Sequence, residues 1–368
     1  MGILAEKEDG MEPLEPLLAL DVGSGTQDLF LWDPQQVAEN CLQMVLPSPT
    51  RMLAKKVREA TRKALPIHLT GFLMGGGPVA WAIREHAKAG LEVTAEPQAA
   101  LTLHDNLEHV EEMGIRILED PPEHSWVIPM GDIQRKVLGP ILEKLEIAEP
   151  RIWCVAVQDH GHQPHGSNRE FRFQHWRKLL EQGGHLSATL YKDPPSYMTR
   201  MLSVLRQVPQ GLVMDTGMAA IHGAMCDPLV DGALESGVLI VNLGNQHTLG
   251  ALVTRERVWG IFEHHTGALR PETLKLWMHR FRLGQVDSQE VMDDGGHGCA
   301  YHPQGLPRGA FDLRVVTGPR RELASSLGWH MAAPLGNMML SGCFGLVRAY
   351  LQAMDIAWPQ AHGAKIHE

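Results

Sequence analysis

The sequence predicts an α/β fold with helices on both faces of its sheets. Short apolar runs of strand length alternate with stretches of helical periodicity along most of the 368 residues. Several of the apolar runs end in polar turns that are rich in glycine. Alternating strands and helices are typical of layered α/β sheets, in which ligands bind where the strands end.

The N-terminal part begins with two predicted strands, at 17–20 and 28–32, joined by the turn DVGSGT at 21–26. Residues 50–64 carry apolar side chains at helical spacing, with lysine and arginine between them, so we predict an amphipathic helix. A strand at 68–74 then ends in the turn GGGP and precedes a helix at 79–89. We also expect short strands near 92–94 and 115–117 and a helix near 133–145.

The C-terminal part repeats this pattern with variation. A strand at 151–157 is followed by the long polar turn 158–169. Further strands are predicted at 211–214, 237–241 and 311–317, and each of them ends in a turn that contains glycine. The predicted helices of this part cover 171–182, 197–206, 270–283 and 338–353.

Composition limits the functional classes. The chain is 44% apolar and 21% charged, as in ordinary globular proteins, and its net charge of -10 argues against a nucleic-acid or membrane-surface binder. No apolar run approaches the roughly 18 residues of a membrane helix. The acidic start lacks the apolar segment of a secretory signal, and the five cysteines are scattered, so we expect a cytoplasmic protein without disulfides.

The glycine turns occur in the order of a known set of motifs. In this respect the chain resembles the superfamily of ATP-binding proteins that contains actin, DnaK-type chaperones and sugar kinases. Asp215 followed by Ala219-Ala220-Ile221 has the spacing of the chaperone connecting helix. The matching segments are 21–26 for the first phosphate motif, 211–225 for the connecting helix, 240–248 for the second phosphate motif, 315–323 for the adenosine motif and 342–350 for the second connecting helix.

The resemblance implies two ribonuclease-H-like lobes with a central cleft. The first lobe would span 16–235, enlarged by an insertion and completed by 337–358, and the second would span 237–335. Bound ATP and Mg²⁺ are implied as well. The match covers about 16–35 and 211–352 and leaves most of 36–210 without a counterpart.

More narrowly, the chain resembles a family described as putative pyruvate formate-lyase activating enzymes. The segments QDHG, SNREFRF, DTGMAAI, NLGNQHT, FEHHTG and DDGGHG carry this likeness. A radical activase needs three closely spaced thiolates, as in C-x-x-x-C-x-x-C, to hold an iron–sulfur cluster. The chain has no such spacing, so its sequence does not favour radical chemistry.

Candidate site residues follow from the motifs. As catalytic residues we predict Asp21, Asp215, Asp159 and His160. The nucleotide or phosphate would be bound by Gly23, Ser24, Gly25, Thr26, Asn242, Gly244, Asn245, Gln246, His247, Thr248, Gly318 and Arg320. Asn242 departs from the superfamily, which usually has a carboxylate at this position, and a neutral amide supports Mg²⁺ less well.

Each of these residues also has a simpler interpretation. Asp21 is either a ligand to the waters of Mg²⁺ or an aspartate that forms its own turn. Asp215 either orients a group for attack on the γ-phosphate or caps a helix. Gly244 and Thr248 fit a phosphate loop and a tight hairpin equally well. Arg320 fits a base contact or a solvated surface.

Histidines supply a rival hypothesis. Several of the 20 histidines cluster in turns with carboxylates, and such groups are ligands for Zn²⁺, Fe²⁺ or Mn²⁺. They also fit an anionic substrate or a general base. No fixed metal-binding spacing is present. The candidates for metal or substrate binding are His160, Glu263, His264, His265, Asp293, Asp294 and His297.

The arginines and lysine at 169–178 lie near aromatic residues. We interpret them as a local anion patch or as one face of an amphipathic helix. The leading hypothesis is a nucleotide-binding protein, an ATP/Mg²⁺-dependent phosphotransferase or ATPase whose substrate is a small molecule or a protein. The alternatives are a metalloenzyme with a degenerate nucleotide site and a nucleotide sensor without catalysis.

Overall fold

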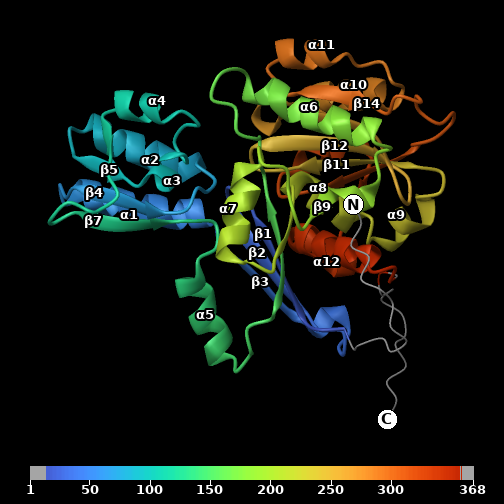
Figure 1. Cartoon of the computed structure of the whole chain (residues 1–368). Helices are drawn as coiled ribbons and strands as arrows, with labels where there is room; N and C mark the ends of the chain where they lie inside the picture. Colours follow the sequence, from blue (N-terminus) through green and yellow to red (C-terminus); the bar gives the residue numbers. More distant parts are fainter. Residues whose placement is uncertain (1–13, 357, 359–368) are drawn as a thin grey trace.

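The computed structural model describes residues 14–356 and residue 358, so most of the acidic start lies outside the described residues. The described chain forms two six-stranded mixed sheets, one four-stranded parallel sheet and helices that cover them (Figure 1). The predicted α/β fold class is therefore confirmed. Among the described residues, no helix combines the length and the apolar character that crossing a membrane requires.

The first six-stranded sheet has the order β3-β2-β1-β8-β10-β9. Its first three strands form an antiparallel meander, and β8 and β10 continue parallel to β1. The pairing of β1 with β2 extends to Val22 and Gln27, so the predicted turn at 21–26 is shorter than expected and Asp21 pairs across the ladder with Asp28. The strands are β1 (Leu17–Val22), β2 (Thr26–Trp32), β3 (Leu42–Pro47), β8 (Ile152–Val157), β9 (Leu190–Tyr191) and β10 (Leu212–Met214).

The second six-stranded sheet has the order β14-β13-β12-β11-β15-β16. Strands β11, β12 and β13 again form an antiparallel meander, and β15 runs parallel to the first strand of it. Five strands of each sheet therefore share one pattern, a three-stranded antiparallel meander followed by two strands parallel to its first strand, whereas β9 and β14 are added at different edges. The strands are β11 (Val238–Leu243), β12 (His247–Val253), β13 (Val258–His265), β14 (Gly298–Tyr301), β15 (Leu313–Thr317) and β16 (His330–Met331).

The four-stranded sheet has the order β6-β5-β4-β7 and a hydrophobic core of its own, and Figure 1 shows it beside the two larger sheets. Strand β7 was not predicted because it contains Pro129, but an edge strand tolerates proline. The elements are β4 (Ile67–Gly71), β5 (Val93–Ala95), β6 (Ile115–Ile117), β7 (Trp126–Met130), α1 (Pro49–Arg62), α2 (Gly77–Lys88), α3 (Pro97–Ala100) and α4 (Leu107–Glu112).

Helices α8 (Thr216–Ala224) and α12 (Ser341–Ala353) pack against each other, and α8 contacts β11 and β15 while α12 contacts β1, β2 and β8. Their backbones approach closely because both helices carry glycine at the crossing. A Cβ atom on Gly345 would lie 1.9 Å from the carbonyl oxygen of Ala219, and one on Gly223 would lie 1.7 Å from that of Ser341. The two helices therefore pack closely at these glycines.

The remaining helices cover the sheets. Helix α6 precedes the second sheet in the chain, yet it packs on β13 and β14 of that sheet (Figure 1). The bounds are α5 (Arg135–Lys144), α6 (Asn168–Glu181), α7 (Thr199–Gln207), α9 (Pro228–Ala233), α10 (Pro271–Arg282) and α11 (Ser288–Asp293). Short 3₁₀ turns occupy Ala38–Asn40, Leu186–Thr189, Thr266–Ala268, Arg321–Leu327, Pro334–Gly336 and Met338–Leu340.

Candidate functional site

A polar cavity of about 340 Å³ is lined by segments of all three sheets. It contains the turns that follow β1, β4, β8, β10 and β11, so residues far apart in the sequence meet there. The predicted site residues that line it are Asp21, Gly23, Ser24, Thr26, Asp159, His160, Asp215, Asn242, Gly244, Asn245, Gln246, His247, Glu263 and Gly318.

The two turns expected to hold phosphate both line this cavity. Each turn is closed by a backbone hydrogen bond: Gly23 N–H donates to the carbonyl of Thr26 at 2.9 Å, and Gly244 N–H donates to that of His247 at 3.0 Å. A Cβ atom on Gly25 would lie 2.5 Å from Nδ2 of Asn245, so the turns are in direct contact. The half-sites predicted from separate parts of the sequence therefore lie side by side.

Two predicted phosphate residues point elsewhere. Thr248 is fully buried, and its hydroxyl lies 3.0 Å from that of Thr266. This contact stabilises the hairpin, and Thr248 does not line the cavity. Arg320 is exposed and donates to Glu322 at 3.0 Å. Gly318 has a φ of 97°, which favours glycine, and its backbone lies directly against the side chain of Asn242.

Two aspartates on the wall of the cavity each keep one carboxylate oxygen without a hydrogen-bond partner, Oδ1 of Asp21 and Oδ1 of Asp28. Removal from water, with the charges of Asp28 and Asp215, raises the pKa of Asp21 well above 3.8. Burial raises the pKa of Asp28 to about 7. Sequence reasoning missed Asp28, whose only signal is a carboxylate directly before the apolar run 29–32.

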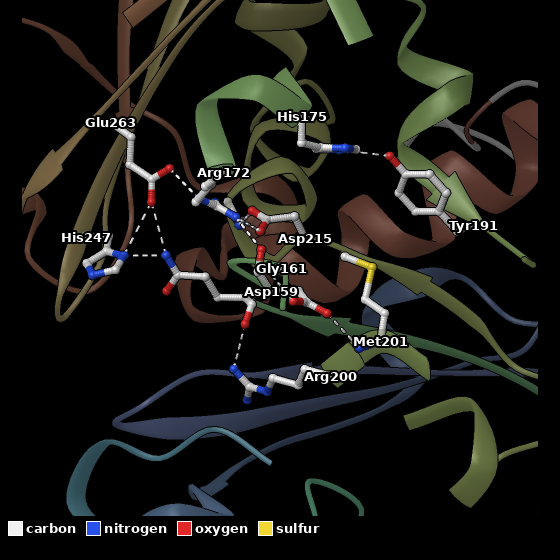
Figure 2. Close-up of polar contacts among 12 residues, drawn as sticks. Asp159, Gly161, Arg172, His175, Tyr191, Arg200, Met201, Asp215, His247 and Glu263 are labelled. Atoms are coloured by element: carbon white, nitrogen blue, oxygen red, sulfur yellow. Dashed lines mark hydrogen bonds and ion pairs between the residues drawn. The ribbon is translucent and has the colours of Figure 1, made fainter. Parts of the chain in front are cut away.

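An arginine on α6 ties the site together. Arg172 Nη1 donates to Asp215 Oδ2 at 2.8 Å, and its Nε donates to Glu263 Oε2 at 2.6 Å (Figure 2). All three side chains are at least 95% buried. Burial opposes ionisation of Glu263, but Arg172 together with His247 and His297 holds the pKa of this carboxyl well below 4.5. The interpretation of Arg172 as part of an anion patch or a solvated helix face was therefore wrong, because this side chain is buried between acidic partners from distant parts of the chain.

Asp215 is also the N-cap of α8, where its Oδ1 accepts from Gly217 N–H at 2.9 Å. Asp159 has a comparable backbone role. Its Oδ1 accepts from Gly161 N–H at 2.8 Å, and its Oδ2 accepts from Met201 N–H at 2.9 Å (Figure 2). Two of the three predicted catalytic carboxylates, Asp215 and Asp159, therefore hold backbone amides at the edge of the cavity.

Three histidines from three segments converge beside Glu263. His160 follows β8, His247 begins β12 and His297 precedes β14, and one nitrogen of each lies within 4.8 Å of the others. Burial and the charge of Arg172 lower the pKa of His160 well below 6.5, and burial lowers the pKa of His297 to about 3. The imidazoles of His160 and His297 are therefore neutral at pH 7.

The other residues predicted for metal binding lie around this group. His265 is adjacent, with its ring centroid 4.8 Å from that of His297. His264 is buried and points to Asp294 Oδ2 at 3.2 Å, and Asp293 accepts from Gln289 at 2.9 Å. Within the part of the chain that the structure describes, the three histidines are the one set of three or more ligands close enough to share an ion.

The cysteines do not form a cluster. All five are buried and free. They lie on or beside different elements: Cys41 before β3, Cys154 on β8, Cys226 after α8, Cys299 on β14 and Cys343 on α12. The three thiolates of a radical activase are therefore not brought together by the fold.

Comparisons with known proteins give one family and several distant structures. The model of the family described as "Putative pyruvate format-lyase activating enzyme (DUF1786)" matches residues 74–323, more than half of the chain. No curated protein matches the chain.

The solved structures that resemble the chain have low similarity scores. An inorganic polyphosphate/ATP-glucomannokinase from Arthrobacter sp. strain KM is 12% identical with a TM-score of 0.35 and covers 92% of this chain and 100% of its own. The ethanolamine utilization protein EutJ from Carboxydothermus hydrogenoformans is 10% identical with a TM-score of 0.32 and covers 92% and 90%. A ROK hexokinase from Thermus thermophilus is 12% identical with a TM-score of 0.29 and covers 92% and 99%.

Proposed function

The chain belongs to the family described as "Putative pyruvate format-lyase activating enzyme (DUF1786)", and we propose that it binds Mg²⁺–ATP in the polar cavity and transfers or hydrolyses the terminal phosphoryl group. One observation carries this proposal. The turn after β1 and the turn after β11 contact each other and line one cavity together with Asp21 and Asp28. Backbone amides in glycine turns bind phosphate, and carboxylates hold Mg²⁺ and its waters.

Our proposal includes the two-lobe architecture. The shared strand order of the two six-stranded sheets supports two ribonuclease-H-like lobes, 16–235 completed by 337–358 and 237–335. Helices α8 and α12 would then connect the lobes, and the four-stranded sheet with its helices would be the insertion in the first lobe. The cavity would be the cleft between the lobes, where closure excludes water.

The residues fit a magnesium nucleotide. Oδ1 of Asp21 and Oδ1 of Asp28 are buried without partners, which is costly unless a cation or its waters complete them. Mg²⁺ would neutralise charge on the phosphates. The amides of the turns at 23–26 and 244–247 would bind the phosphate oxygens, and Gly318 would approach the base because no side chain intervenes. Asn242 would contribute a neutral oxygen.

In this proposal Asp215 orients the attacking hydroxyl or water. Its Oδ2 is held by Arg172 and its Oδ1 by Gly217 N–H, so the carboxylate is fixed before any ligand arrives. Fixed groups aimed at the reacting atoms account for much of the catalysis of phosphoryl transfer. The acceptor would enter from the side of His160 and of the turn at 75–77, which lines the same cavity.

The experiment is a titration of the full chain with a fluorescent ATP analogue, with and without Mg²⁺, together with an assay of phosphate release. We expect Mg²⁺-dependent binding that Asp21→Asn weakens at least about tenfold, or 1.4 kcal/mol. Asp193→Asn, at an exposed position, is the matched control. An absence of binding at millimolar ATP contradicts the proposal. Tight binding without phosphate release identifies a sensor instead.

A further inference from the structure

The histidine group stands at the edge of the proposed nucleotide site, which uses the backbone of His247 but no imidazole as a ligand of the phosphates. The ring centroids of His247 and His297 are 4.7 Å apart, and that of His160 is 5.5 Å from the first and 5.8 Å from the second. Three separate parts of the chain bring these rings together. Since each nitrogen lies within 4.8 Å of the others, small side-chain rotations would close them to the spacing of about 3.3 Å that a tetrahedral ion with Zn–N bonds near 2.0–2.1 Å requires.

One member of the group has a polar atom that the protein leaves without a partner. His297 is only 3% exposed, and its Nδ1 has no hydrogen-bond partner. Leaving a buried acceptor or donor unpaired is costly. A metal ion coordinated by this ring would remove that cost.

The surroundings of His247 have the form of a metal ligand with its supporting carboxylate. Nδ1 of His247 lies 3.3 Å from Oε1 of Glu263, and the amide of Gln158 contacts His247 and donates to the same oxygen at 3.1 Å (Figure 2). Metal binding through Nε2 would place the ring proton on Nδ1, where Glu263 would accept it in place of the contact with the Gln158 amide, as a carboxylate does for many metal-bound histidines. Glu263 is itself held by Arg172.

The charges around the group also favour a cation. Glu263 and Asp215 carry two negative charges in the interior, and Arg172 supplies one positive charge. The network therefore has one negative charge in excess. Burying an uncompensated charge is costly, and a divalent ion next to Glu263 would offset it.

We propose that His160, His247 and His297 bind a divalent transition metal, with Zn²⁺ as the expected ion, at the edge of the polar cavity. Imidazole ligands suit zinc, iron, copper and nickel, and they exclude the oxygen-seeking Mg²⁺ from this position. Three protein ligands leave a fourth position open, as in catalytic zinc sites. His160 and His247 line the cavity, so the open position faces it and takes a water or an oxygen of an anionic substrate.

The test uses the full chain, freed of metal with a chelator and kept without nucleotide or Mg²⁺. Zn²⁺ is titrated in competition with a chromophoric chelator, and Co²⁺ is used as a spectroscopic probe of coordination. We expect one ion per chain, a dissociation constant below about 1 µM (8.2 kcal/mol) and visible bands of low-symmetry cobalt. Glu263→Gln should weaken binding by roughly 10–100-fold, and His247→Ala and His160→Ala should weaken it further.

His124→Ala is the matched control, because this side chain is 87% exposed and distant in the chain from the group. His160 lies in a half-exposed loop, so His160→Ala tests the site even where a change at buried His297 prevents folding. A dissociation constant weaker than about 100 µM would overturn the proposal. So would zinc binding that all these variants retain. Neither result depends on nucleotide binding.

Discussion

Arg172 Nη1 lies 2.8 Å from Oδ2 of Asp215, and both side chains are at least 95% buried. The same guanidinium reaches Glu263 on β13, so α6 joins the turn after β10 to the second sheet through one side chain. The two carboxylates belong to the two halves of the proposed nucleotide cleft. Arg172 therefore fixes the relative position of groups on opposite sides of the cavity.

Arg172→Met should lower the free energy of unfolding by about 3–5 kcal/mol, because it leaves two buried carboxylates without their cation. Arg172→Lys should lose less stability, since the lysine ammonium still replaces part of the contacts that the forked guanidinium makes with the two carboxylates. Urea unfolding measures both. Arg177→Ala on the exposed side of the same helix is the control and should stay within about 0.5 kcal/mol of wild type. A loss below 1 kcal/mol for Arg172→Met would mean that the pair is not formed.

Asp28 makes the stability depend on pH. Its pKa is raised from 3.8 to about 7 by burial, so between these values the folded state holds a proton that the unfolded state has released. Stability from this group is complete below the unfolded pKa and is lost as the pH rises towards 7. Asp28→Asn should therefore stabilise the protein at pH 8 by up to about 4 kcal/mol and leave it unchanged at pH 4.

Urea unfolding at the two pH values, without Mg²⁺, measures this effect. Asp312→Asn is the control, because the Asp312 side chain is 82% exposed. Mg²⁺ should reduce the stability lost by wild type at pH 8, since a bound cation favours the ionised carboxylate. An equal pH dependence in Asp28→Asn and wild type would contradict the assignment.

Gly345→Ala tests the contact between the helices that we propose to connect the lobes. The added methyl group would lie 1.9 Å from the carbonyl oxygen of Ala219, which is part of a helix and cannot turn away. Overpacking of this kind costs about 1–3 kcal/mol or more. Gly232→Ala in α9 meets open space and should instead stabilise by about 0.5–1 kcal/mol. Thermal unfolding of the two variants should shift in opposite directions, and equal shifts would exclude close helix packing.

The sequence predicts the strands and their glycine turns because these depend on local pattern. A strand ends where an apolar run is followed by turn residues such as glycine and asparagine. The strands and turns at 17–26 and 237–248 were therefore found from the sequence alone. Strand β3 was missed because its residues are only partly buried and do not form a continuous apolar run.

The interior of the site depends on contacts between distant residues. The sequence predicts a helix at 171–182, but the direction of the Arg172 side chain depends on Asp215 and Glu263, which are 43 and 91 residues away. The histidine group likewise needs three loops to meet. The sequence favoured His264 and Asp294 for metal or substrate binding because they stand next to other candidates. In the structure it is His247 that lies near His160 and His297, and the sequence had assigned His247 to phosphate binding.

Asp159→Asn separates a structural carboxylate from a catalytic one. Both oxygens of Asp159 accept backbone N–H groups, so an amide would place its own N–H against one of them and lower the free energy of unfolding by about 1–3 kcal/mol. Affinity of the folded variant for the ATP analogue should change by less than about threefold, under 1 kcal/mol.

Asp21→Asn should keep the free energy of unfolding and weaken the affinity for the ATP analogue. Its Oδ1 has no hydrogen-bond partner to lose, and the substitution removes a carboxylate with a raised pKa. The pair of variants is compared by urea unfolding and by nucleotide titration. If Asp159→Asn keeps full stability and abolishes phosphate release, Asp159 is catalytic, as its sequence position beside His160 predicts.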